Sequence, residues 1–453
     1  MNNQKQKMEL LGNVPVAKAL LAMGIPTMIG MLINALYNLV DAYFVGGLGE
    51  SQMGAISIVY PLGQVVVGLG LLFGNGAASY ISRLLGQRKE EQANKVASTS
   101  LYCSLTIGII LILFCVVFLK PILILLGATK SILPYAMTYA GIYIISCIFN
   151  VFNVTMNNIV TSEGAAKTTM LALLTGAILN IALDPIFIYT FDLGVAGAAI
   201  ATAISQVVST LVYLYYLFSK KSIFRFRLKD CSFSKEIFSE IFKIGVPTLV
   251  FQLLTSLSIS LINNASGTYG DAAIAGMGVV TRLVSMGSLT VFGFIKGFQP
   301  IAGYSYGAKK YERLRQAIKT SILWSTIFCV VVGFGFFLFP TQIVSQFTTG
   351  NVEMIHIGAN SLRINGITFM LFGYYTVYSS LFLALGKGKE GFLLGACRQG
   401  ICFIPVILIL PSIWGLNGIL YAQPIADVLS FLISLFMALS LHKQLNLSGT
   451  QIN

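Results

Sequence analysis

The sequence predicts an all-α integral membrane protein with twelve transmembrane helices in two pseudo-symmetric six-helix bundles. The chain has 453 residues, of which 56% are hydrophobic and only 10% are charged, whereas a soluble domain carries about 25% charged residues. About 250 apolar residues suffice for about a dozen crossings of about 20 residues each. The second half also repeats the glycine and proline pattern of the first. This composition excludes a soluble enzyme, a nucleic-acid-binding protein and a disordered chain.

Apolar runs separated by turn residues and charges give the expected helices in chain order. Their ranges are 17–44, 54–76, 97–119, 132–160, 168–190, 195–218, 241–266, 274–298, 317–339, 355–385, 391–411 and 415–440. The segment before the first helix is polar and lacks the apolar core of a cleavable signal peptide.

Lysine and arginine are distributed unevenly among the loops between these helices. If the N-terminus is cytoplasmic, the outward loops hold only Lys120 and Lys130. The inward loops hold Arg83, Arg88, Lys89, Lys95, Lys167, Lys220, Lys221, Arg225, Arg227, Lys229, Lys235, Lys309, Lys310, Arg313, Arg315, Lys387 and Lys389. This positive-inside pattern predicts a multi-pass protein of the inner (cytoplasmic) membrane with both termini in the cytoplasm. It also accounts for the net charge of +13 without a nucleic-acid partner.

A long polar connector divides the chain into an N-terminal lobe (1–218), a cytoplasmic linker (219–240) and a C-terminal lobe (241–453). The lobes repeat at an offset of 221 residues. The matched positions are Gly24-Ile25-Pro26-Thr27 with Gly245-Val246-Pro247-Thr248, Gly46 and Gly49 with Gly267 and Gly270, Gly76 with Gly297, Gly86 with Gly307, and Gly194 and Gly197 with Gly415 and Gly418. Parallel repeats of six helices predict a cavity between the lobes and alternating access. The alternative is a duplicated scaffold that does not transport.

Acidic residues inside the predicted helices indicate a functional site, because a charge in hydrocarbon is costly. Asp184 and Asn180 share one face of the fifth helix. Asp41 near the outer end of the first helix and Thr202 in the sixth are expected at the same depth. Two carboxylates, an amide oxygen and a hydroxyl suit Na⁺, or a proton held between paired acids.

Structural explanations of these residues stay open: Asp184 could cap a kink at Pro185, Asn180 could join two helices, and Asp41 could reach the membrane interface. The second half favours a site over these explanations. The residues that correspond to Asp41, Asp184 and Thr202 are Ile262, Pro405 and Gln423, whereas a scaffold residue should recur in both repeats.

Further polar side chains suggest a chamber for flat amphipathic ligands in the first half. The candidates are Tyr37, Tyr139, Asn153 and Asn157, and ordinary hydrogen bonding between helices is the alternative. Pro26 predicts a position where the first helix can bend. We expect Asp427 to form a structural ion pair with Arg398, Lys296 or Arg282.

The sequence lacks the motifs of ATPases, serine hydrolases, zinc proteases and kinases. With only His356 and His442 and seven scattered cysteines, a histidine-rich or CxxC metal site is excluded, and the thiols are expected to be free. We therefore expect no enzyme and no cofactor. The energy source would be an ion gradient or the gradient of the substrate itself.

The chain resembles the multidrug and toxic compound extrusion (MATE) family, close to its MepA-like and DinF-type branch. The matching stretches are Ile25-Pro26, Tyr37-Asn38, Asp41 through Gly49, Ser162-Glu163-Gly164-Ala165-Ala166-Lys167, Leu179-Asn180-Ile181-Ala182-Leu183-Asp184-Pro185, Gln299-Pro300-Ile301-Ala302-Gly303-Tyr304 and Gln423-Pro424-Ile425-Ala426-Asp427. The resemblance implies the MATE/MOP fold and export driven by H⁺ or Na⁺. It also implies a cation site of Asp41, Asn180, Asp184 and Thr202, with Tyr139 and Asn157 beside it.

We therefore expect a monomeric antiporter in the lipid bilayer that exports amphipathic, often cationic, drugs in exchange for H⁺ or Na⁺. A flippase for lipid-linked precursors, with a more cationic central cavity, is the alternative. A membrane-bound transferase is disfavoured, because no catalytic acid or histidine stands out near the surface.

Overall fold

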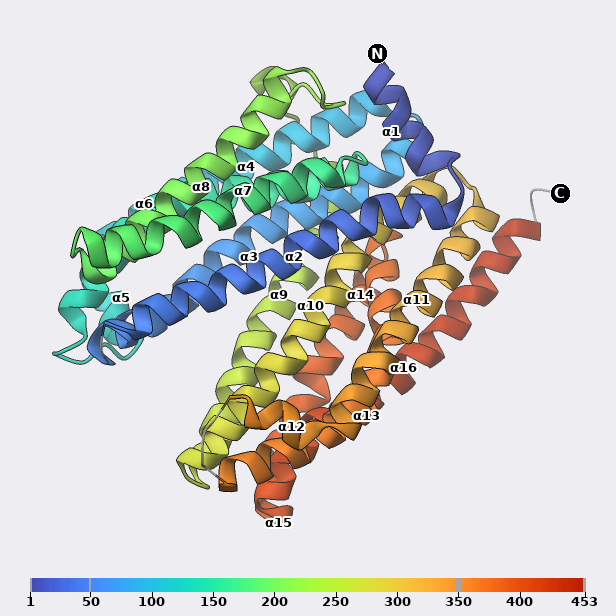
Figure 1. The fold of residues 1–453 in the computed structure, drawn as a ribbon. Coiled ribbons are helices and arrows are strands. Elements are labelled where there is room, and N and C mark those ends of the chain that lie inside the picture. Colours follow the sequence, from blue (N-terminus) through green and yellow to red (C-terminus); the bar gives the residue numbers. More distant parts are fainter. Residues whose placement is uncertain (1, 49, 348–351, 451–453) are drawn as a thin grey trace.

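The computed structural model describes residues 2–48, 50–347 and 352–450, and helices are the regular secondary structure within these ranges (Figure 1). Twelve helical segments of this part of the chain are long and apolar enough to cross a membrane, which confirms the predicted count. The elements are α1 (Asn2–Gly12), α2 (Val16–Gly46), α3 (Glu50–Gly86), α4 (Glu90–Val117), α5 (Leu119–Leu125), α6 (Leu133–Ser162), α7 (Ala166–Pro185), the π-helix η1 (Ile186–Thr190), α8 (Gly194–Phe218), the 3₁₀-helix η2 (Leu228–Asp230), α9 (Lys235–Gly267), α10 (Asp271–Gly307), α11 (Tyr311–Leu338), α12 (Pro340–Ser345), α13 (Val352–Ala384), α14 (Gly388–Ala396), the π-helix η3 (Cys397–Ile401), α15 (Phe403–Trp414) and α16 (Leu416–Thr450).

Two helices run well past the apolar segments that predicted them. α3 and α10 were expected to end at 76 and 298, but they continue to Gly86 and Gly307. In each case the chain leaves the helix through a residue with positive φ, Arg88 at 62° and Lys309 at 56°. Hydropathy detects only the part of a helix that lies in hydrocarbon, so it did not predict the polar final turns of α3 and α10.

Several short elements were not predicted. They are α1, α5, α12, the 3₁₀-helix η2, the π-helical turn η1 that ends the fifth span, and the π-helical turn η3 that interrupts the eleventh. The turn η1 follows directly after Pro185, which has no N–H to continue the regular ladder of hydrogen bonds.

The helices form two bundles that meet at one end of the molecule and diverge at the other (Figure 1). The first bundle is α2–α8 and the second bundle is α9–α16. The end where the bundles meet carries both chain termini and is called the closed end here; the open end carries α5, α12 and α15. α8 ends at Phe218 and α9 begins at Lys235, and the division into lobes at 218 and 241 stays a prediction.

The repeated glycines form the contacts between the bundles at the closed end. A Cβ atom on Gly307 would lie 2.1 Å from the carbonyl oxygen of Arg83, and one on Gly86 would lie 2.2 Å from that of Tyr304. These two contacts are equivalent under the 221-residue offset. Only glycine permits backbones to approach so closely. The repeat recognised in the sequence therefore encodes the packing of one bundle on the other; its member Gly49 lies outside the described residues.

Glycines also form contacts in two helix pairs that are equivalent under the offset, α2 with α10 and α9 with α3. A Cβ atom on Gly297 of α10 would lie 2.5 Å from the backbone nitrogen of Gly24 in α2. In the equivalent helix pair, which also joins the two bundles, a Cβ atom on Gly245 of α9 would lie 2.0 Å from the carbonyl oxygen of Leu72 in α3. α2 thus crosses onto α10 and α9 crosses onto α3.

The N-terminal helix α1 connects the two bundles at the closed end. Its Lys7 is buried and forms an ion pair with the fully buried Glu163 at 3.4 Å. On the other side, the guanidinium of Arg313 in α11 donates to the carbonyl oxygens of Leu11 at 3.1 Å and Val14 at 2.5 Å. A polar terminal segment that hydropathy alone leaves unassigned is therefore held by both halves of the protein.

Candidate functional site

Four oxygen-bearing side chains that the sequence singled out meet inside the first bundle. Asp41 comes from α2, Asn180 and Asp184 from α7, and Thr202 from α8. Asn180 and Asp184 are fully buried, and Thr202 is 5% exposed. The carboxyl groups of Asp41 and Asp184 approach closely enough to share a hydrogen bond.

The amide of Asn180 links the other members of this group. Its Nδ2 atom lies 3.4 Å from Thr202 Oγ1. In the opposite amide orientation the nitrogen donates to Asp184 Oδ2 at 3.1 Å. Among the described residues, Asp41 Oδ1 and Asp184 Oδ1 are buried without a donor. Buried oxygens with no donor suit a cation or a proton.

Two of the predicted chamber residues border this group. The hydroxyl of Tyr37 lies close to Thr202 and within electrostatic range of Asp41. Tyr139 lies within electrostatic range of Asp41, and its ring stacks on that of Tyr143 with centroids 5.7 Å apart and an interplanar angle of 11°. The group of carboxyl, amide and hydroxyl oxygens therefore has an aromatic wall.

The two asparagines predicted on one face of α6 have separate surroundings. Asn153 Nδ2 donates to the side chain of Gln206 at 2.8 Å, and its Oδ1 accepts from Thr210 Oγ1 at 2.9 Å, both in α8. Asn157 donates to Tyr213 Oη at 3.2 Å and accepts from Lys296 of the second bundle. Asn153 is occupied in joining helices, while Asn157 lies between the bundles.

The proline of the repeated motif lies within a continuous helix. α2 runs from Val16 to Gly46 through Pro26, and the neighbouring Thr27 Oγ1 donates to the carbonyl oxygen of Met23 at 2.9 Å. A bend at Pro26 therefore stays a prediction for another state of the molecule.

The third intramembrane aspartate forms the predicted structural ion pair. Arg398 Nε donates to Asp427 Oδ1 at 2.8 Å, and the two side chains are only 7% and 6% exposed. Gln423 Nε2 donates to the same carboxylate oxygen at 2.7 Å. Of the three partners considered, Arg398 is the one that Asp427 binds.

The predicted cavity between the lobes is present, with a volume of about 520 Å³ between the bundles; the sequence analysis did not name the residues that line it. Most of its wall belongs to α9, α10, α13 and the α14–η3 segment, while Tyr60, Asn75 and Asn158 come from the first bundle. Lys296 and Arg398 line it, and no aspartate or glutamate is among its described lining residues. The sequence did carry a signal: at the 221-residue offset, Lys296 corresponds to the neutral Asn75.

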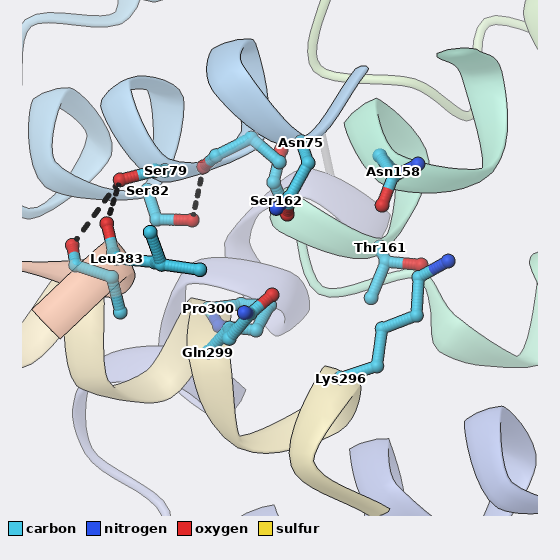
Figure 2. Close-up of a pocket in the computed structure, with 12 residues that line it drawn as sticks. Asn75, Ser79, Ser82, Asn158, Thr161, Ser162, Lys296, Gln299, Pro300 and Leu383 are labelled. Atoms are coloured by element: carbon cyan, nitrogen blue, oxygen red, sulfur yellow. Dashed lines mark hydrogen bonds between the residues drawn. The ribbon is translucent and has the colours of Figure 1, made fainter. Parts of the chain in front are cut away.

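Toward the closed end this cavity narrows to a polar contact between the bundles (Figure 2). Asn75, Asn158 and Thr161 of the first bundle face Lys296 and Gln299 of α10 there. Ser79 Oγ donates to the carbonyl oxygen of Leu383 at 2.5 Å across the bundles. The amine of Lys296 points toward Thr161 and Asn158, so its charge lies among neutral polar groups.

Comparison with known proteins identifies the family. A family model described as MatE matches residues 26–186 and 247–409. The chain is 33% identical over 445 residues to multidrug export protein MepA of Staphylococcus aureus (strain MRSA252), covering 97% of each chain. It is 33% identical over 448 residues to the MepA protein of Staphylococcus saprophyticus, covering 96% of each. It also superimposes, with a TM-score of 0.92 and 29% identity over 97% of this chain and 99% of the other, on a structure described as the outward-facing conformation of a multidrug resistance MATE family transporter of the MOP superfamily. The chain has the fold of those proteins and belongs to the MATE family of multidrug transporters, which are not enzymes.

Proposed function

We propose that this protein exports amphipathic, often cationic, organic compounds in exchange for H⁺ or Na⁺. The observation that carries the proposal is the close approach of Asp41 and Asp184 inside the first bundle, with Asn180 and Thr202 beside them. A pair of buried acids is costly unless a cation or a proton neutralises it. Such a pair therefore binds a coupling ion with an affinity that depends on its surroundings.

Coupling requires that the ion favour one arrangement of the helices over another. The four side chains belong to α2, α7 and α8, so an ion bound by all four holds three helices together. When the ion leaves, repulsion between the carboxylates favours separation of α2 from α7. Because α2 also packs on α10 through Gly24 and Gly297, such a movement would alter the contact between the bundles, and Pro26 gives α2 a place to bend.

The aromatic wall suits the proposed substrates. Tyr37 and Tyr139 present flat apolar surfaces with hydroxyl groups next to the acids. Aromatic faces and carboxylates attract flat organic cations. Substrate and coupling ion would then compete for one chamber, which is one way to couple their exchange.

The basic loops support an orientation with both termini in the cytoplasm. The bundles would then be closed toward the cytoplasm and open toward the outside, as in the similar transporter described as outward-facing. We propose the inner membrane as the location and a monomer as the transporting unit.

Efflux of a cationic dye from proteoliposomes, under separately imposed Na⁺ and H⁺ gradients, tests the proposal. We expect one gradient to drive export by the parent protein. Asp41→Asn and Asp184→Asn should abolish gradient-driven export while membrane insertion is retained. Asp192→Asn makes the same chemical change at an exposed position and should export normally. Parent-like export by both chamber variants would refute the ion site.

A flippase for lipid-linked precursors is the second candidate, because the cavity between the bundles carries Lys296 and no acidic lining residue among those described. A flippase should move a lipid diphosphate across vesicles without any gradient-driven dye export. Dye export that the lipid does not inhibit would favour the drug transporter.

A further inference from the structure

The cavity between the bundles carries a charge of opposite sign to that of the chamber around Asp41. Its volume of about 520 Å³ lies within the range of about 300–1,000 Å³ typical of drug-sized ligands. Phe292, Tyr375 and Met277 supply apolar wall, and Gln252, Gln299 and other uncharged residues supply polar wall. Neither Asp41 nor Asp184 lines it.

Of the two cationic groups in this wall, one is already neutralised. Asp427 binds Arg398 through Nε at 2.8 Å and through a second guanidinium nitrogen at 3.4 Å. The guanidinium also lies 4.6 Å from the centroid of the Phe372 ring. Arg398 is thus held by its own bundle and brings no net charge to the cavity.

Lys296 is different, because its ammonium has no carboxylate partner among the described residues. Its one hydrogen bond there goes to the neutral Oδ1 of Asn157. An ammonium has three N–H donors, so donors remain for a ligand. A charge in a confined site without a counter-ion is costly, and an anion that enters the cavity removes that cost.

The repeat indicates that the fold itself does not require this charge. Asn75 is the equivalent residue of the first bundle, and it lines the same cavity. There its Nδ2 atom donates to Thr248 Oγ1 at 2.8 Å, so a neutral side chain satisfies the same position of the packing. The lysine is therefore a departure from the repeat that changes the chemistry of the cavity.

We propose that this cavity binds an amphipathic organic anion, with the negative group of the ligand on Lys296 and its apolar body against Phe292 and Tyr375. The site would give the transporter a second class of substrate, carboxylate-bearing molecules, besides the cations of the first chamber. The inference rests on the proposed export function for its physiological meaning. The binding site itself can be tested without transport.

The test uses an uncharged coumarin dye with a free carboxylate, which makes it an anion, and the neutral methyl ester of the same dye, bound to purified protein in nanodiscs of neutral lipid and followed by fluorescence anisotropy. The ratio of the two affinities measures how much the carboxylate contributes to binding. A hydrogen-bonded ion pair typically contributes enough for about a tenfold or larger change. We expect Lys296→Asn, which installs the residue of the other repeat, to lower the preference for the carboxylate at least about tenfold.

Two variants make the comparison specific. Lys296→Arg retains the charge and should keep most of the preference, which a purely structural role of the lysine would not explain. Lys389→Asn removes the same charge from an exposed position and should leave the preference as in the parent. Retained ester binding shows that Lys296→Asn is folded. An unchanged preference in folded Lys296→Asn would overturn the inference.

Anionic groups could also come from lipid headgroups, and a second arm separates the sources. Phosphatidylglycerol is added as a competitor of the ester dye. If it displaces the dye from the parent protein but not from Lys296→Asn, and the parent protein shows no preference for the dye carboxylate, then the anion bound at Lys296 is a lipid headgroup. Failure of the export proposal gives a different result. Neither dye would then be exported, although binding would still show the Lys296-dependent preference for the carboxylate. If neither carboxylate nor lipid depends on Lys296, the site is refuted.

Discussion

Replacing Gly307 with alanine should weaken the closed end of the transporter. The added Cβ atom would lie 2.1 Å from the carbonyl oxygen of Arg83 in α3. Carbon and carbonyl oxygen atoms rarely approach closer than about 3.3 Å. The two helix ends must therefore separate by about 1.2 Å, since the obstructing atom belongs to the backbone and cannot rotate away.

The sign of the effect follows from the contact alone. Alanine favours a helix over glycine by about 1 kcal/mol, but α10 is helical whether the bundles are together or apart at this end, so this gain does not change the ratio of the two arrangements. Overpacking in a rigid contact typically costs about 1–3 kcal/mol. Relief comes when the bundles separate at this end, so the cost acts against the closed arrangement. A bias of this size changes the ratio of two conformations by about 5- to 150-fold.

The assay measures how often the closed end opens. Ser82 lies in the contact between the bundles and is 2% exposed. In a chain without its native cysteines, the thiol of Ser82→Cys should react with a water-soluble maleimide about 5- to 150-fold faster when Gly307→Ala is added. Gly278→Ala in the same helix meets no atom within 4 Å and should leave the rate unchanged. Equal rates in both alanine variants would refute the reasoning.

Two further predictions concern buried ion pairs, with thermal unfolding of the purified protein as the measurement. Glu163→Gln should destabilise the protein by about 3–5 kcal/mol, because it leaves the buried Lys7 without its ion-pair partner. Glu91→Gln is the control: it breaks only an exposed ion pair and should cost less than about 1 kcal/mol. Asp427→Leu should cost about 3–5 kcal/mol, and adding Arg398→Met should restore most of it, because a buried ion pair is worth little more than apolar packing. A double variant as unstable as the single one would contradict this account.

The topology was predictable because the membrane limits what a chain can do. Every span must satisfy its backbone internally, so an apolar run of sufficient length indicates a helix. The repeat was visible in glycines such as Gly86 and Gly307, because close backbone contacts permit only that residue. α1 escaped prediction because its position depends on partners distant in the chain, such as Glu163 and Arg313.

The sequence predicted which residues of the site share one face of a helix, but not which residues of other helices contact them. Asn180 and Asp184, one turn apart, do lie together in the structure. Asn153 and Asn157 satisfy the same spacing, yet one contacts Gln206 and the other contacts Lys296. Spacing along one helix gives the shared face but not the neighbour that covers it. The partner of each asparagine is decided by the packing of α6 between α8 and the second bundle.

The two repeats share their backbone contacts but differ in their ionisable side chains. The contacts between the bundles are symmetric and involve backbone atoms, as at Gly86 and Gly307, so both are lost together when the closed end opens. The ionisable groups are asymmetric, with Asp184 in the first bundle and Lys296 in the second. If both proposed sites bind their ligands, ligands of either charge would act on one shared equilibrium between two packings, and no continuous path of residues between the two sites is needed. Each ligand has only to bind one packing more tightly than the other.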